Sequence, residues 1–375
     1  MQICICRISV KIKIGDITKI RTGKLDANAA DENGQYPFFT CSKEPLKINT
    51  YSYDCECVLV AGNGDLNVKY YNGKFDAYQR TYIIEDDSDG LLFMPYLYFF
   101  MESYIDELRK QSIGGVIKYI KLKNLTDALI ELPSIEVQRK IVNIISKAKE
   151  IVRRKENEFE LLDELVKARF VEMFGDPVTN PKGWETTSIG DECYYIKDCP
   201  HKSLPDIGRD NGGHPFISVR NIVNGYIDFS DARYISDEDY YDSIKKCHPE
   251  KGDMLYSKGG TTGIAKLIDI DEPFANWVHV AVLKFDKFRL NGIFFENMLN
   301  GDYCYSQSQR LTKGIANRDL VLSAMAQIKL YCPPLELQNQ FASFVEEIDK
   351  SRSRIQKSLE TSQELFDSLM QEYFG

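Results

Sequence analysis

Two stretches of the chain carry an apolar residue at alternating steps of four and three positions. The first series runs Ile141, Ile145, Ala148, Val152, Lys155, Phe159, Leu162, Val166, Arg169 and Met173, and the second runs Phe341, Val345, Ile348, Arg352, Ile355, Leu359, Ser362, Phe366, Leu369 and Tyr373. An apolar seam with a period of about 3.5 residues predicts a helix that wraps around a partner helix. The other positions are largely polar, so neither helix is stable alone in water and each seam needs a mate.

These stretches belong to an internal repeat, in which residues 133–175 return at 333–375 without insertion. Proline and glutamate near each start, and Gly175 at the end of the first copy, match the residues that begin and end helices. One interpretation is that each helix packs only on its own domain. We favour a single antiparallel coiled coil between the two copies, because both seams run for more than four heptads without a skip.

The segments that precede the two helices resemble each other only loosely. Short β-like runs alternate with turns and helical runs, as at residues 57–61, 81–84, 94–101, 253–257 and 278–283. The run Tyr36–Phe39 in one segment matches His214–Ile217 in the other. We therefore predict an α+β protein with two globular domains, 1–132 and 176–332, joined by helices at 133–175 and 333–375 that form an antiparallel coiled coil.

Composition narrows the class of protein. The chain is 43% hydrophobic and 27% charged, its longest apolar stretch is too short to cross a membrane, and Met1–Arg7 is too short for a signal peptide. Ten scattered cysteines without a Cys-x-x-Cys pair indicate a reducing compartment, so we expect a cytoplasmic protein. Cys193, Cys199 and His201 lack a fourth ligand at ordinary spacing, so no metal site is predicted.

Several catalytic motifs are missing from the sequence. There is no Asn-Pro-Pro-aromatic tetrapeptide for amino-group methylation, no Gly-x-Gly-x-x-Gly fingerprint and no nucleophile elbow. The segment Gly259–Gly263 lacks the lysine of a phosphate-binding loop, because Lys266 comes too late. We predict no catalytic residue in this chain, against the hypothesis of a self-contained methyltransferase or nuclease.

The segment Met173–Glu185 closely resembles the junction after the central helix in specificity (S) subunits of type I restriction–modification enzymes. Four further stretches are similar to segments of this family: 132–141 and 332–338 to the start of each conserved helix, 253–263 to a glycine-rich strand and turn, and 73–82 to part of one class of target-recognition domain. The lead-in Met1–Lys13 departs from the family pattern, because it lacks the Lys-Gly-Trp-Glu opening present at 182–185.

The resemblance implies a function and a set of partners. Two target-recognition domains would each read half of an interrupted site in double-stranded DNA, and the two helices would fix the spacer. Two methyltransferase (M) subunits would dock on the chain, and restriction (R) subunits could join. The complex would methylate adenine N6 with S-adenosylmethionine held by the M subunits, or cleave DNA with ATP and Mg²⁺ in the R subunits. The S chain itself would be non-catalytic and hold no cofactor.

The candidate DNA contacts are side chains able to bind phosphate, base edges or base faces. In the first domain they are Lys43, Lys69, Lys74, Tyr78, Gln79 and Arg80, and in the second they are Arg220, Asn221, Ser257, Lys258, Thr261, Thr262, Trp277 and His279. Lys118, Arg310 and Lys313 are weaker candidates. Structural roles compete with each assignment: Tyr78 could be a core residue, Gly259–Gly263 a plain hairpin turn, and His279 a buried, hydrogen-bonded histidine.

The net charge of −9 argues mildly against a nucleic-acid partner. It does not decide the matter, because a DNA groove needs only a local basic face and acidic surface elsewhere can bind other subunits. The competing hypothesis is a two-headed scaffold that binds proteins and not DNA.

Overall fold

The computed structural model describes residues 10–199, 201–315 and 317–375. The chain divides into two compact units, one of Met1–Glu158 with Ile355–Gly375 and one of Phe159–Arg354. This division differs from the predicted boundaries, because each long helix contributes one part to each unit. The predicted start of the first domain, most of its lead-in, Cys4 and Cys6 lie outside the described residues.

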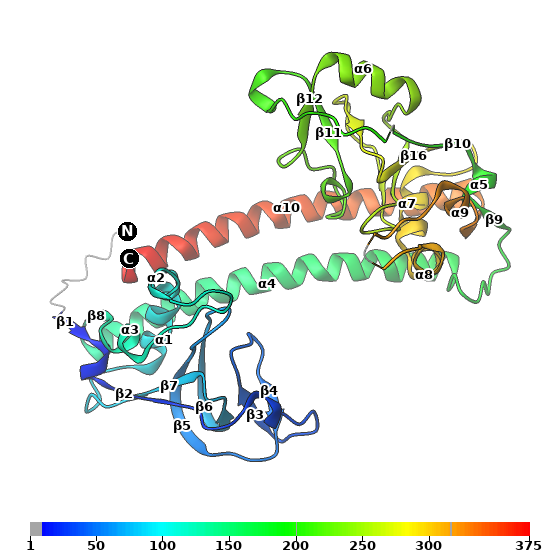
Figure 1. Ribbon diagram of the computed structural model, residues 1–375. Coiled ribbons are helices and arrows are strands. Elements are labelled where there is room, and N and C mark those ends of the chain that lie inside the picture. Colours follow the sequence, from blue (N-terminus) through cyan, green and yellow to red (C-terminus); the bar gives the residue numbers. More distant parts are fainter. Residues whose placement is uncertain (1–9, 200, 316) are drawn as a thin grey trace. The chain divides into compact units, whose positions relative to one another are not determined.

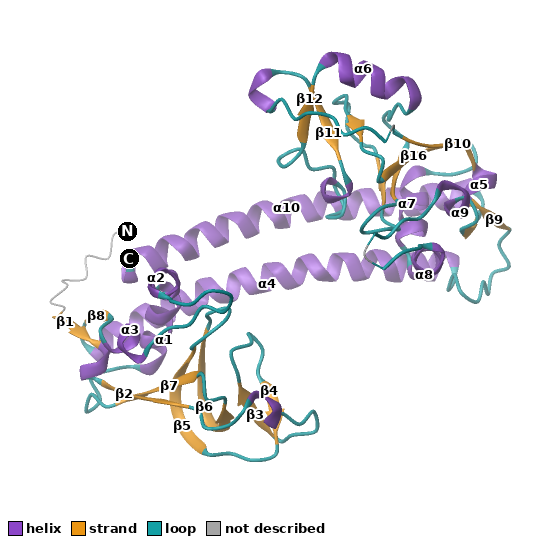
Figure 2. Cartoon of the chain, viewed as in Figure 1, coloured by secondary structure: helices purple, strands orange, loops and turns teal. Residues whose placement is uncertain are grey.

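The two repeated segments form two long helices, α4 (Ile135–Phe174) and α10 (Leu335–Phe374), each of 40 residues (Figure 2). Equivalent buried glutamines fasten the two helix starts. The Gln138 Oε1 accepts the N–H of Phe93 at 2.8 Å, and its amide donates to Pro133 O. Gln338 makes the same pair of bonds with Asn291 N and Pro333 O. The last turn of α4 is followed by Gly175 at φ 82°, a conformation that favours glycine.

The predicted coiled coil is confirmed, and it can be followed within each unit. In the second unit the ring of Phe341 packs on Phe170 and Phe174, with centroids 5.4 and 5.6 Å apart. In the first unit Ile141 and Ile145 share a core with residues of the last turns of α10, including Phe366. Early residues of one helix meet late residues of the other, so the pairing is antiparallel. Every predicted seam position is buried or half-buried.

The globular part of the first unit, which we call head 1 (residues 10–132), is built on a curved sheet (Figure 1). Its described strands follow the order β2 (Thr18–Thr22), β7 (Thr81–Asp86), β5 (Tyr53–Ala61), β6 (Val68–Ala77), β3 (Tyr36–Phe39) and β4 (Leu46–Ile48). A second pair joins β1 (Val10–Lys13) to β8 (Leu129–Leu132). The helices are α1 (Met94–Ser103), α2 (Ile105–Gln111) and α3 (Leu122–Thr126). The predicted runs at 57–61, 81–84 and 94–101 lie in β5, β7 and α1.

The globular part of the second unit, head 2 (residues 176–332), repeats this plan with shorter strands. One described sheet has the order β10 (Cys193–Asp198), β16 (Val280–Phe285), β13 (Met254–Ser257) and β14 (Ala265–Leu267), and another has β12 (Arg233–Ile235), β11 (His214–Ile217) and β15 (Ala275–Asn276). A third pairs β17 (Lys329–Tyr331) with β9 (Thr186–Ser188). The helices are α5 (Ile189–Glu192), α6 (Asp237–Lys246), α7 (Gly292–Asn300), α8 (Asp302–Leu311) and α9 (Leu322–Met325).

A short parallel pairing relates the two heads residue by residue. In head 1, Phe39 of β3 lies opposite Ala77 at the end of β6. In head 2, Ile217 of β11 lies opposite Asn276 at the end of β15. The antiparallel pairing of β3 with β4 is equivalent to that of β11 with β12, since Phe38 lies opposite Leu46 and Phe216 lies opposite Arg233. The two heads therefore share a scaffold, and equivalent positions can be compared for their chemistry.

Candidate nucleic-acid interface

Each head carries an aromatic residue directly after this parallel pair. The N–H of Tyr78 donates to Phe39 O at 2.9 Å, and the N–H of Trp277 donates to Ile217 O at 2.8 Å. The carbonyl of each then accepts the N–H of the residue three positions on, at 2.8 and 2.9 Å. We call residues 77–81 and 276–280 the aromatic turns. They make Tyr78 equivalent to Trp277 and Arg80 equivalent to His279.

A glycine lies close under each aromatic turn. The N–H of Gly62 donates to Arg80 O at 2.8 Å, and the N–H groups of Lys258 and Gly259 reach His279 O at 2.8 and 3.3 Å. A Cβ on Gly62 would lie 2.3 Å from Arg80 O, and one on Gly259 would lie 2.0 Å from His279 Nδ1. Only glycine therefore permits this close approach, which fixes the aromatic turn against the neighbouring strand end.

In head 1 the structure gathers most of the predicted residues at one place. The loop after β3, which carries the exposed Lys43, touches the aromatic turn through Cys41, whose Sγ lies 3.7 Å from Arg80 O. The amide of Asn67 donates to Cys41 O at 2.8 Å and its oxygen accepts the Lys69 ammonium. Burial lowers the pKa of Lys69 from its ordinary value. Gln79 and Arg80 are exposed at the rim of this cluster.

Lys74 is not part of this cluster. It lies on β6 five residues beyond Lys69, a separation of about 17 Å along an extended strand. Its ammonium stands 4.6 Å from the centroid of the Tyr51 ring, and a hydrogen bond with Tyr51 raises the pKa of Lys74. Lys43, Lys69, Tyr78, Gln79 and Arg80 can therefore contact one ligand together, whereas Lys74 would need a second point of contact.

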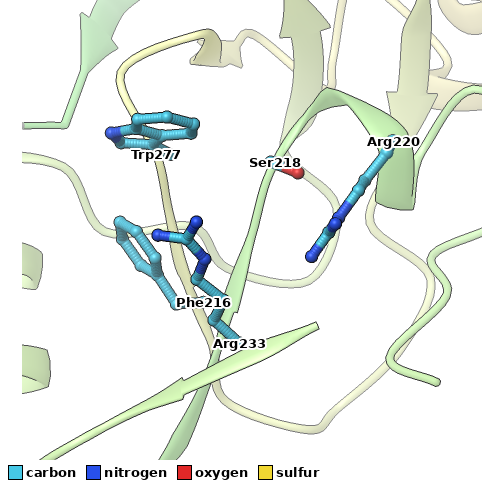
Figure 3. Close-up of a pocket in the computed structure, with 5 residues that line it drawn as sticks. All are labelled: Phe216, Ser218, Arg220, Arg233 and Trp277. Atoms are coloured by element: carbon cyan, nitrogen blue, oxygen red, sulfur yellow. The ribbon is translucent and has the colours of Figure 1, made fainter. Parts of the chain in front are cut away.

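In head 2 a small pocket of about 130 Å³ opens beside the aromatic turn (Figure 3). We call it the arginine pocket, and its lining residues are Phe216, Ser218, Arg220, Arg233 and Trp277. The guanidinium of Arg220 is held by Asp231, at 3.2 Å from its carboxylate and 2.8 Å from its carbonyl. The guanidinium of Arg233 stands 5.8 Å from the centroid of the Trp277 ring.

Hydrogen bonds and packing hold Trp277 in place. The buried amide of Asn276 donates across the aromatic turn to Val280 O at 2.7 Å. Phe216 belongs to a compact apolar cluster, against which the half-buried Trp277 ring packs. His279 follows with its ring edge-on to Trp277, at a centroid distance of 5.0 Å. The pocket wall is therefore preorganised before any ligand arrives.

Two of the predicted contacts in head 2 are corrected by burial within the domain. Asn221 is only 2% exposed, accepts the N–H of Ser218 at 2.8 Å and donates to Asp228 O at 2.9 Å. Ser257 is fully buried and accepts the N–H of Ile264 at 2.8 Å. Both side chains are used to shape loops, because a buried polar group without a partner would be destabilising.

Lys258 and Thr262 are corrected for the same reason. The Lys258 ammonium lies 3.1 Å from Asp319 and 3.5 Å from Asp198, and the residue is 5% exposed. The hydroxyl of Thr262 pairs with that of Thr312 at 2.9 Å. These residues fasten the glycine-rich turn to the loop before α9. Within that turn Thr261 is exposed, and its contact with DNA stays a prediction.

Sequence reasoning missed Phe216, Ser218 and Arg233 as members of a site. The match between Tyr36–Phe39 and His214–Ile217 marks the shared strand, and it could have drawn attention to Phe216. Arg233 carries no such signal, because the pocket is assembled from three segments far apart in the sequence. The sequence analysis also did not match Tyr78 with Trp277, because these residues are 199 positions apart whereas the repeated helices are 200 positions apart.

The described residues contain no group of three or more His, Cys, Asp or Glu side chains arranged to hold a metal ion. Cys193 and Cys199 are buried, and burial raises their thiol pKa values to about 12 and about 11. No helix in the described part of the chain combines the length and apolar character needed to span a membrane.

Comparison with known proteins identifies the family to which this chain belongs. The model of the type I restriction modification DNA specificity domain matches residues 9–161 and 181–364, most of the chain. The chain belongs to this family. It is 38% identical over 222 residues to the type I restriction enzyme EcoDI specificity subunit of Escherichia coli, a match that covers 57% of this chain and 49% of that protein. The chain therefore spans about half the length of this relative.

A second relative is matched over a longer stretch. The MjaVIII specificity subunit of Methanocaldococcus jannaschii is 22% identical over 381 residues, covering 92% of this chain and 89% of that protein. Among solved structures, the S subunit of a type I restriction–modification system from M. genitalium superposes with a TM-score of 0.64 at 15% identity. That match covers 100% of this chain and 98% of the other. At this identity the likeness shows that the two share a fold.

Proposed function

We propose that this chain is the sequence-specific DNA-binding subunit of a type I restriction–modification complex, in which each head reads one half of a bipartite site. The observation that carries the proposal is the pair of aromatic turns. One scaffold presents Tyr78 and Arg80 in head 1 and Trp277 and His279 in head 2. Equal backbones with unequal side chains are what two readers of different half-sites require.

Local charge supports a DNA partner despite the net −9. Lys43 and Arg80 are exposed beside Tyr78, and the Arg80 guanidinium has no hydrogen-bond or ion-pair partner in the described residues. In head 2 the exposed Arg220 and Arg233 stand beside Trp277. Exposed cations next to an aromatic ring suit phosphate binding together with a base contact.

The coiled coil sets the spacer in this proposal. α4 and α10 are unbroken over 40 residues, about 60 Å at ~1.5 Å per residue. Both helices run through both units, so their length fixes how far along a duplex the two readers act. An antiparallel pair of one repeated helix also gives each unit the same framework, which matches a site read in two halves.

Two equivalent surfaces support two copies of a methyltransferase partner. A pocket of about 290 Å³ in the second unit includes Lys167 and Phe170 of α4. A pocket of about 570 Å³ in the first unit includes Asp367 and Met370 of α10, the same repeat positions 200 residues on. The M subunits would bring S-adenosylmethionine and methylate adenine N6, and R subunits, where present, would bring ATP and Mg²⁺. This chain supplies recognition and no catalytic group.

A DNA-binding assay in the presence of an M subunit tests the proposal. Band shifts with random duplex across a salt series should show log K falling steeply with log salt, because each phosphate contact releases counterions. The net charge of −9 favours the alternative, a two-headed protein scaffold. Binding that is absent or indifferent to salt would favour that scaffold and contradict our proposal.

A further inference from the structure

Arg233 stands out among the residues of the arginine pocket. It begins β12 and faces Phe216 of β11 in antiparallel register, so both side chains lie at the same pocket wall. Figure 3 draws its guanidinium below the Trp277 ring and beside the Phe216 ring, with Arg220 across the pocket. The Trp277 ring centroid lies 5.8 Å from this guanidinium, and its attraction favours the placement of Arg233 at the pocket wall.

The donors of this guanidinium are unused. Within the described residues Arg233 makes no side-chain hydrogen bond or ion pair, whereas Arg220 is held by Asp231. Asp206, the other acid near the two arginines, accepts the N–H groups of Gly208 and Tyr234, each at 3.0 Å. These backbone bonds chiefly, helped by the charges of both arginines, lower the pKa of Asp206. A guanidinium with free donors is ready for a ligand with paired acceptors.

The size of the pocket decides what kind of ligand it takes. Pockets that enclose a small molecule measure about 300–1,000 Å³, and this one has about 130 Å³. It can therefore receive only the edge of a larger ligand. On DNA two edges offer paired acceptors to arginine: two oxygens of a phosphate, and the O6 and N7 atoms of guanine.

Comparison with head 1 separates these two possibilities. The position equivalent to Arg233 is Leu46, because Phe38 faces Leu46 as Phe216 faces Arg233. Phosphates are alike along every duplex, so a phosphate anchor at this position would serve both heads. A side chain that changes from leucine to arginine between two readers is instead suited to a base that differs between their half-sites.

We propose that Arg233 is the specificity-determining residue of head 2 and reads a guanine through its O6 and N7 atoms, with Trp277 as a positioning residue. The inference rests on the proposed function and specifies which chemical group of DNA head 2 would recognise. Arg220, anchored by Asp231 at the pocket rim, remains available to the neighbouring phosphate.

Sequencing of modified sites tests this inference. Wild-type chain, R233K, R233A and W277F would each be produced with the M partner, and the methylated sites mapped across a genome. K251A is a matched control, since Lys251 is an exposed cation of head 2 paired with Asp271. We expect R233K and R233A to lose a guanine preference by about 10-fold or more at one position of one half-site. W277F should weaken it at that same position, and K251A should leave it unchanged.

R233K distinguishes the two sources of paired acceptors. Lysine keeps the charge but lacks the planar fork, so a phosphate anchor would survive the change, whereas a bidentate guanine contact beside Trp277 would be weakened. An unchanged motif with R233K, or uniformly weaker binding without a change of motif in R233A, would overturn the inference. The inference would also be overturned if neither R233K nor R233A changed a guanine preference in either half-site. A wild-type complex that modifies no specific site would instead show that the proposed function itself fails.

Discussion

Tyr78 and Trp277 occupy one backbone position in two different heads, each donating its N–H to the residue that ends the parallel-paired strand, Phe39 or Ile217. A glycine lies under each turn, Gly62 in one and Gly259 in the other. What differs is the chemistry around the ring: Arg80 and Leu46 in head 1, His279 and Arg233 in head 2. A shared scaffold with exchanged side chains is what the proposed function requires of one duplicated chain with two unlike half-sites.

Replacing Gly62 or Gly259 by alanine should distort the aromatic turn of its head and weaken DNA binding by that head. In G62A the new Cβ would meet Arg80 O, and in G259A it would meet His279 Nδ1, so the aromatic turn must shift. We expect a loss of about 1–3 kcal/mol in stability, typical of overpacking, and weaker DNA binding. Gly115 has nothing within 4 Å of an added Cβ, so G115A is the control. Thermal unfolding and band shifts would measure both effects, and unchanged behaviour of both variants would refute the role of these turns.

Removing the free guanidinium of head 1 should alter the salt dependence of DNA binding. If Arg80 contacts a phosphate, R80A should reduce the slope of log K against log salt by about 1. Lys110 is an exposed cation of the same head, paired with Glu107, and K110A removes an equal charge. The slope of K110A should match the wild type, and equal effects of the two variants would point to net charge alone.

Two exposed leucines at the same repeat position should control partner stoichiometry. Leu165 on α4 is 46% exposed and Leu365 on α10 is 54% exposed. These leucines do not line the two pockets. If each M subunit also covers the helix face that carries them, L165E and L365E should each leave one bound copy, and the double variant none, because glutamate opposes burial in an apolar contact. Native mass spectrometry of the complexes would count the copies. Loss of both copies in either single variant would contradict independent docking.

The aromatic contact between the long helices should dominate the stability of the second unit. Phe341 is fully buried against Phe170 and Phe174. Truncation in F341A should cost about 3–5 kcal/mol, the usual range for a buried phenylalanine. Leu161 on α4 is 59% exposed, so L161A should change little. Denaturant unfolding followed by circular dichroism compares them, and similar midpoints would show that the seam contributes little.

The long helices were predictable because their seams are local and periodic. Apolar neighbours three and four positions away indicate that residues such as Ile145 and Val345 lie on the buried face of a helix. The same period indicated that each helix packs on a partner helix, and the repeat at an offset of 200 residues indicated which segment is that partner. The start of each helix also carries local signals, proline and glutamate, whereas the role of Gln138 and Gln338 in fastening these starts is visible only in the structure.

The site was less predictable, because burial and pairing there depend on distant segments. Lys258 looked like an exposed phosphate ligand, yet its partners Asp198 and Asp319 lie about 60 residues away on either side. Arg233 looked like an ordinary charge, and only the strand register puts it beside Trp277. Tyr78, Arg80, Trp277 and His279 were chosen from the sequence as candidate DNA contacts and lie in the aromatic turns, but their equivalence needed the fold and their contact with DNA stays a prediction.

The central claim is that the coiled coil fixes the spacing between two readers, and changing its length tests this most directly. One heptad inserted after Lys155 and another after Ile355 would lengthen both helices by about 10 Å while preserving both seams. Phe159 of α4 meets Arg352 of α10, so by the same antiparallel register the two insertions lie opposite each other. Mapping methylated sites in cells with the M partner should then give the same two half-sites with a spacer longer by about three base pairs. An unchanged spacer in an active complex would contradict the account.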